Sequence, residues 1–138
     1  MRKAFTLIEL LVVIALIGIL STLVIANLNS ARERSRDAQR KSDLRNIQTA
    51  LRLYYNDTGS YPITSAFPTG GNPWTVGMTT YMSTFPKDPL SPTQDYRYVQ
   101  TDSDTYTLDA CLENKSDDKC VTDASFCPTS ECKYTVKP

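Results

Sequence analysis

The chain has 138 residues, of which 15 are Lys or Arg, 15 are Asp or Glu and none is His. Its length fits one small domain with an anchor, and the lack of histidine removes the commonest general base and metal ligand, so the composition disfavours an enzyme. Residues 1–55 carry nine basic and four acidic residues, a net charge of +5, and residues 56–138 carry six and eleven, a net charge of −5. This asymmetry favours either end-to-side attraction between copies or a solvated head on a basic stalk.

Residues 5–26 are apolar apart from a few small or hydroxyl-bearing residues and one carboxylate, Glu9. As a helix, Leu10 to Ala26 would be about 25 Å long, slightly shorter than the ~30 Å hydrocarbon core of a bilayer. Adding residues 5–8 completes a span but places Glu9 inside it, where a carboxylate costs about 2.5–3.5 kcal/mol. Such a charge requires a partner.

Two ordinary interpretations of this run leave Glu9 unexplained. A secretory signal peptide would use Arg2-Lys3 before the run and Val24-Ile25-Ala26 as its cleavage site. Glu9 and the helical pattern that continues beyond Ala26 disfavour that interpretation. A plain single-pass anchor explains the length of the run but gives the carboxylate no role.

The first residues, Met1-Arg-Lys-Ala4 and Phe5-Thr-Leu-Ile-Glu9-Leu, resemble the leader and mature start of type IV pilins and type II secretion pseudopilins. The resemblance implies that a prepilin peptidase removes residues 1–4, cutting between Ala4 and Phe5 on the cytoplasmic face, and that Phe5 is then N-methylated. It also implies a partner for Glu9, the Phe5 ammonium of a neighbouring copy, because an unpaired charge in an apolar filament core is costly. Leaders of this family usually end in Gly, so Ala4 departs from the pattern but keeps a small residue.

Residues 27–55 contain no Gly or Pro and continue the helix as its amphipathic half, after the membrane and filament-core half at residues 5–26. The full helix from residue 5 to residue 55 would be about 75 Å long. It is predicted to stop at residues 56–59, where Gly can take a left-handed conformation. The apolar stripe of the second half is assigned to Leu44, Ile47, Leu51 and Tyr54, at 3-4-3 spacing, together with Ala31 and Ala38.

A basic cluster lies in the same half of the helix. It is mixed with Glu33, Asp37 and Asp43 and has no interleaved aromatic residue, so it favours a solvated or inter-subunit face and does not indicate nucleic acid. By the positive-inside rule the cluster would prefer the cytoplasm, whereas the resemblance places the leader there. The cluster consists of Arg32, Arg34, Arg36, Arg40, Lys41 and Arg45.

The head, residues 56–138, begins with two further resemblances to the same family. The helix exit, Leu51-Arg-Leu-Tyr-Tyr-Asn-Asp-Thr-Gly-Ser-Tyr61-Pro62, and the segment Phe85-Pro-Lys-Asp88-Pro89 resemble the major pseudopilin of type II secretion and its pilin relatives. Residues 56–95 are rich in Pro and Gly and predict a connecting loop with a short helical turn at 79–84. Asp88 is interpreted as a turn residue and Trp74 as a buried anchor.

Alternating β-formers at residues 96–100 and 105–112 predict a hairpin, and residues 133–136 predict a third strand. The fold class is α+β. Together with the resemblance this implies a pilin fold, in which a long amino-terminal helix packs on a small antiparallel sheet and a cysteine-bearing tail, residues 113–138, follows. Asp102 and Asp104, between the first two strands, are candidate calcium ligands, as are Asp117 and Asp118, although no cofactor is required.

All four cysteines lie after residue 110, which favours disulfides and an oxidising compartment. Three pairings are open, and Cys111–Cys120 with Cys127–Cys132 is favoured because each closes a short polar loop. A four-cysteine zinc site is the rival, but no C-x-x-C motif occurs.

The sequence therefore predicts a structural filament subunit rather than an enzyme or sensor on an anchor. The main prediction is the major subunit of an extracellular type IV pilus, with the major pseudopilin of a periplasmic type II secretion pseudopilus as the alternative. The resemblance implies as partners further copies of the chain, a prepilin peptidase, an assembly platform in the inner membrane, and the membrane itself before assembly.

Overall fold

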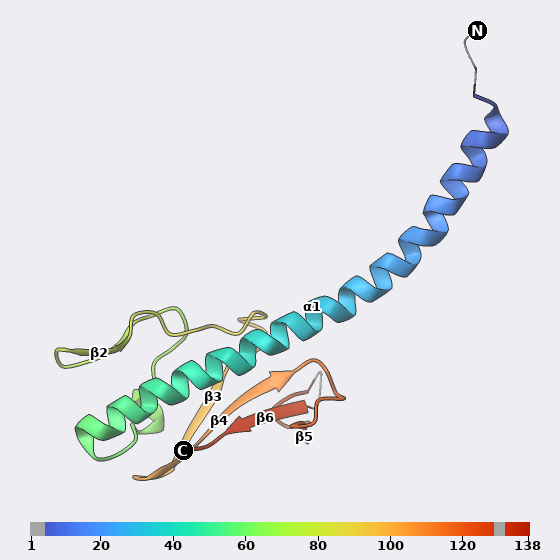
Figure 1. Cartoon of the computed structure of the whole chain (residues 1–138). Coiled ribbons are helices and arrows are strands. Elements are labelled where there is room, and N and C mark those ends of the chain that lie inside the picture. The colour runs from blue at the N-terminus through green and yellow to red at the C-terminus, as the bar shows by residue number, and fades with distance from the viewer. Residues whose placement is uncertain (1–4, 129–131) are drawn as a thin grey trace. The chain divides into compact units, whose positions relative to one another are not determined.

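Figure 1 shows the computed structural model of the chain, which describes residues 5–128 and 132–138, without the side chains of residues 23, 24 and 26. The chain divides into two compact units, residues 1–34 and residues 35–138. Helix α1, Leu7–Thr58, provides nearly all of the described part of the first unit and opens the second. The predicted α+β class, a long amino-terminal helix followed by a small antiparallel head, is confirmed.

Helix α1 has 52 residues and contains no proline. At its end the Gly59 amide donates to the Tyr55 carbonyl over 2.8 Å, and Gly59 has a φ of +75°. Glycine takes this left-handed conformation without the steric penalty that a Cβ would bring. The predicted stop is confirmed, and the last helical residue is Thr58.

The second unit holds two antiparallel sheets. The larger has the strand order β3-β4-β6-β5, and the smaller is a hairpin of β1 and β2. Figure 1 shows the large sheet and the hairpin on opposite sides of the part of α1 that belongs to this unit. The bounds are β1 Trp74–Val76, β2 Thr79–Met82, β3 Arg97–Asp102, β4 Thr105–Leu112, β5 Val121–Thr122 and β6 Cys132–Val136, with a 3-10 helix η1 at Thr64–Ala66.

Three of the four strands of the large sheet, β3, β4 and β6, follow the sequence prediction, and β5 was not predicted. Tyr98 pairs with Leu108, and Leu108 pairs in turn with Val136, so the predicted hairpin and the third strand are adjacent. Alternate residues of β3 and β4 point toward α1, and Tyr98, Tyr106 and Leu108 are buried there.

The predicted helical turn at 79–84 is wrong, because residues 79–82 form strand β2 instead. Val76 pairs with Thr79 across a tight turn in which Gly77 has a φ of +60°. The segment is rich in β-branched and aromatic residues, which favour a strand once a glycine permits the turn.

The core lies between α1 and the large sheet. Leu44, Ile47 and Leu51 are fully buried, so the predicted stripe is confirmed for them, and each contributes about 1.5–3 kcal/mol of hydrophobic stabilisation. Ala31 and Ala38 are exposed, so their assignment to the stripe is wrong. On the other side of α1, Tyr54 stacks on Trp74, which is buried as predicted, and Tyr81 packs edge-on against Tyr54.

The two disulfides join Cys111 to Cys127 and Cys120 to Cys132, with Cα–Cα distances of 5.5 and 5.1 Å. The predicted pairing, Cys111–Cys120 with Cys127–Cys132, is therefore wrong. Sheet register explains the difference: Thr122 of β5 pairs with Cys132 of β6, which brings Cys120 alongside. Cys111 of β4 pairs with Lys133, the residue after Cys132. The side chain of Cys111 therefore points to the opposite face of the sheet from that of Cys132.

Non-reducing peptide mapping of the oxidised chain is expected to recover linked peptides that contain Cys111 with Cys127 and Cys120 with Cys132. The double variant Cys111→Ala/Cys127→Ala is expected to lose about 2–4 kcal/mol of unfolding free energy, because the unfolded tail gains freedom. A peptide linking Cys111 to Cys120 would contradict this register.

Candidate assembly site

Thr6 and Glu9 form a reciprocal cap at the start of α1. The Thr6 amide and the Thr6 hydroxyl each donate to Glu9 Oε2 over 2.9 Å, and the Glu9 amide donates to Thr6 Oγ1 over 3.3 Å. This is the capping box S/T-x-x-E, which satisfies backbone amides that have no partner within the helix. The Thr-x-x-Glu spacing in the sequence is a signal for this box, whereas Glu9 was interpreted above only as a charge.

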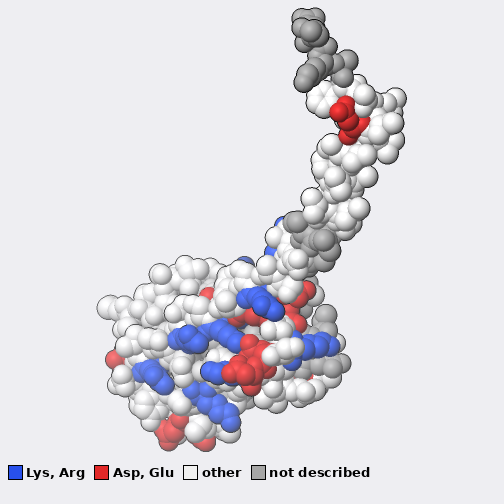
Figure 2. All heavy atoms as spheres, turned by 45° about the vertical axis from the view of Figure 1, so that its right-hand side comes forward, with Lys and Arg blue, Asp and Glu red and all other residues white. Residues whose placement is uncertain are grey.

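The segment that follows this cap is apolar on every side. Its large apolar side chains from Phe5 to Leu20 are all exposed within the described structure, and Figure 2 shows this part of the surface with an acidic group near its end. Helix α1 contains a segment that is long and apolar enough to cross a membrane by length and composition. A helix that is apolar all round is suited to lipid or to the interior of an assembly, rather than to water.

Glu9 is exposed and accepts hydrogen bonds only from Thr6 among the residues that the structure describes. A carboxylate has about four acceptor positions, so Oε1 remains available to a donor from outside the chain. Phe5 is also exposed, and Ala4, on the other side of the predicted cleavage site, lies outside the described residues. The geometry thus leaves both members of the predicted charge pair, Phe5 and Glu9, accessible to a neighbouring copy.

One member of the basic cluster in the second unit, Arg40, is buried in ion pairs. Arg40 is completely buried: its Nε and Nη2 donate to the two carboxylate oxygens of Asp88 over 2.8 and 3.1 Å. Its Nη1 donates to Asp37 Oδ1 and to Glu113 Oε1, both over 2.7 Å. The prediction of a solvated or inter-subunit face is therefore wrong for Arg40, which instead joins α1 to the loop before β3 and to the end of β4.

The carboxylates around Arg40 are further satisfied by backbone amides. Asp37 accepts from the amides of Glu113 and Asn114, each over 2.9 Å. Asp88 accepts from the Leu90 amide over 2.8 Å, a contact typical of the turn residue that the sequence predicted. The burial of Asp88 and its pairing with Arg40 were not predicted.

The ion pairs of the head make its stability depend on pH. The Arg36 guanidinium beside Glu113 lowers the pKa of that carboxyl, and the Lys133 ammonium lowers the pKa of Asp123. A carboxyl whose pKa is lowered by folding stabilises the fold above its unfolded pKa of about 4, and loses this effect as the pH falls through the folded pKa. Burial raises the pKa of Asp43, which acts in the opposite direction.

Because the lowered carboxyls outnumber the raised one, the unfolding free energy is expected to fall between about pH 4 and pH 2. Denaturant unfolding of the purified chain at a series of pH values measures this. Glu113→Gln should flatten the pH dependence, and an unchanged slope in that variant would contradict the assignment.

Of the four calcium candidates, Asp102 and Asp104 lie at the turn between β3 and β4, and Asp117 forms an ion pair with Lys41. Asp102 accepts from the Asp104 amide over 2.9 Å and from the Thr105 hydroxyl over 2.7 Å. Asp104 accepts from the Tyr55 hydroxyl over 2.7 Å. Within the described residues, no group of three or more His, Cys, Asp or Glu side chains is arranged to hold a metal ion.

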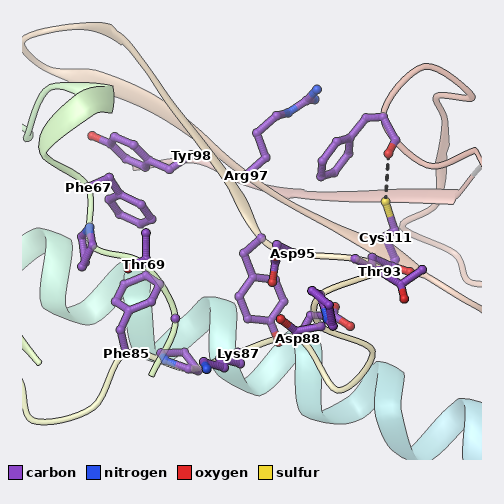
Figure 3. Close-up of a pocket in the computed structure, with 18 of the residues that line it drawn as sticks. Phe67, Thr69, Phe85, Lys87, Asp88, Thr93, Asp95, Arg97, Tyr98 and Cys111 are labelled. Carbon is purple, nitrogen blue, oxygen red and sulfur yellow. Dashed lines mark hydrogen bonds between the residues drawn. The ribbon is translucent and has the colours of Figure 1, made fainter. Parts of the chain in front are cut away.

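A hollow of about 770 Å³ opens beside the start of β3. Figure 3 shows Phe67 and Tyr98 at one side of it, Cys111 at the other, and Lys87 and Asp88 along its base. Phe67 stacks on Tyr98 with ring centroids 4.0 Å apart, and Asp88 is occupied by Arg40. The hollow therefore presents an aromatic side and a polar base in which Asp88 is already paired.

Comparison with known proteins connects these features. The family model for the prokaryotic N-terminal methylation motif matches residues 1–25. The type II secretion system core protein G of Vibrio cholerae serotype O1 is 32% identical over 123 residues, which cover 80% of this chain and 83% of that protein. The chain belongs to the family of type II secretion system core protein G.

Other members of the core protein G family agree. The protein from Pseudomonas aeruginosa is 31% identical over 119 residues, 79% of this chain and 84% of that protein. The protein from Escherichia coli K12 is 38% identical over 64 residues, which cover 46% of this chain and 44% of that protein. No solved structure matches the chain significantly. The resemblance to pilins and pseudopilins is thereby confirmed, and the relatives' names agree with the secretion-type alternative more closely than with a surface pilus.

Proposed function

We propose that this chain is the major subunit of a type II secretion pseudopilus and assembles through its amino-terminal helix. The observation that carries the proposal is the start of α1, where an exposed Phe5 and a capped but accessible Glu9 begin a helix that is apolar all round. In the mature chain Phe5 carries the amino-terminal ammonium and Glu9 a carboxylate. In a membrane, or in the core of a filament, each of these two charges requires an opposite one. A second copy supplies both.

Processing precedes assembly in this proposal. A prepilin peptidase cuts between Ala4 and Phe5, the new amino terminus of Phe5 is methylated, and the chain waits in the inner membrane until an assembly platform adds it to the filament. The match of the methylation motif to residues 1–25 supports processing at this end of the chain. Mass spectrometry of the filament subunit tests it, because the mature chain should begin with a methylated Phe5.

The alternative, a subunit of an extracellular type IV pilus, is supported by the two disulfides of the head, which suit an exposed fibre. The names of the relatives that span most of the chain favour the secretion filament. Deleting the gene distinguishes the two. Loss of extracellular enzymes with unchanged surface pili supports the pseudopilus, and loss of surface pili with normal secretion contradicts it.

The proposed function uses no cofactor. We expect the melting temperature of the purified full-length chain in detergent to be the same in calcium and in excess chelator. A calcium-dependent rise that disappears in Asp102→Asn/Asp104→Asn would instead assign a calcium site to the β3–β4 turn.

A further inference from the structure

The tip of the β1–β2 hairpin presents an apolar side chain that its own chain does not cover. Met78 is fully exposed, and Val76 beside it is 43% exposed. No charged residue occurs between Val76 and Met82, although charged residues make up 22% of the chain. Turns usually carry polar residues, so an uncharged tip with a methionine is unusual.

The hairpin that carries this tip is braced. Trp74, at the base of β1, is buried and stacks on Tyr54 of α1 with ring centroids 5.4 Å apart. Tyr81 of β2 donates its hydroxyl to Asp57 over 3.0 Å, and Figure 1 shows the hairpin extending along α1 to an open end. Because its base is fixed, the hairpin holds Met78 at a defined position rather than leaving it free.

A shallow groove lies between the flank of α1 and the chain that leaves β2. Its volume is about 340 Å³, and Leu53, half-exposed, lies within it. The hairpin's own tip leaves this groove open, since Met78 is fully exposed. Its lining contains no charged residue and consists of Asn46, Thr49, Ala50, Leu53, Tyr81, Met82, Ser83 and Thr84.

We propose that Met78 of one copy seats in this groove, against Leu53, on the next copy of the chain in the filament. Tip and groove are both uncharged, and the flexible thioether of methionine can pack on the apolar part of the lining, Ala50, Leu53 and Met82. The two surfaces are different parts of the same chain, so the contact is heterologous, and a heterologous contact that does not close into a ring produces an open helical filament. This inference rests on the proposed function and adds a contact between heads to the contacts of the amino-terminal helices.

The test is disulfide cross-linking of filaments built from the full chain with Met78→Cys and Leu53→Cys together. The described native cysteines are all paired, so they do not compete. Non-reducing electrophoresis is expected to show a ladder of dimers, trimers and longer species, because each copy links to the next. Each single variant is expected to run as a monomer.

A second measurement does not depend on new cysteines. Met78→Asp is expected to lower the amount of filament about tenfold, with an unchanged melting temperature of the chain, whereas Met78→Leu keeps filament formation. Ile63→Asp is the matched control, since Ile63 is also an exposed apolar residue of the head.

Three results would overturn the inference. They are normal filaments from Met78→Asp, efficient dimers from Met78→Cys alone, which would place two tips together, or filaments of the double variant without a ladder. If the native chain forms no filament under any condition, the proposed function itself fails, and the inference fails with it.

Discussion

Glu9→Ala is expected to insert into the membrane and to fold its head normally, but to assemble into filaments at least about a hundredfold less than the native chain. In the filament, the variant would leave the Phe5 ammonium of the neighbouring copy without a counter-charge in an apolar environment. Stranding one member of a buried ion pair costs about 3–5 kcal/mol, which corresponds to this factor or more. Filaments sheared from cells or membranes and quantified by immunoblot measure the effect, with total chain in the membrane as the reference.

Glu9→Gln separates the charge from the helix cap. A glutamine at this position of a capping box can still accept from the Thr6 amide, but it carries no charge. We therefore expect Glu9→Gln to fail as Glu9→Ala does, and Thr6→Ala, which keeps the charge, to assemble much better than either. Normal filaments from Glu9→Gln would show that the cap, and not the charge pair, is what assembly requires.

The elements that local pattern determines were predictable from sequence. Leu44, Ile47 and Leu51 repeat at helical spacing and are the buried face of α1, and the β3–β4 hairpin follows its β-forming residues. The same helical spacing extends to two charged residues. Arg40 lies one turn and Asp37 two turns before Leu44 at the same 3-4 spacing, so periodicity alone places both on the buried face.

Features that depend on which distant segments meet were not predictable in this way. Two of the three carboxylate partners of Arg40, Asp88 and Glu113, lie 48 and 73 positions later in the chain. The disulfides likewise depend on β5 pairing with β6, and β5 has only two residues. The disulfide prediction rested on loop length, and it was wrong for this reason. Loop length affects the entropy of the unfolded chain, whereas sheet register decides which cysteines meet in the folded chain.

Arg40→Met is expected to lower the unfolding free energy of the chain by about 3–5 kcal/mol, a large fraction of the stability of a small domain. The substitution retains much of the side-chain volume but leaves Asp88, which has no exposed side-chain surface, and the nearby Asp37 without their cation. Denaturant unfolding of the purified chain measures the loss. Arg45→Met is the matched control, because Arg45 is an exposed cation on the same helix and should change the free energy by no more than about 0.5 kcal/mol.

The double variant Arg40→Met/Asp88→Asn shows whether the loss comes from stranded charge. It removes the cation together with the most deeply buried of its carboxylate partners, so it is expected to be more stable than Arg40→Met alone. Of the remaining carboxylates, Asp37 keeps the backbone amides of Glu113 and Asn114 as donors, and Glu113 keeps Arg36. Equal losses in the single and double variants would instead assign the effect to lost packing of the arginine stem. In that case Arg40 would act as a spacer between α1, the loop before β3 and the end of β4, and the charges around it would contribute little to the stability of the head.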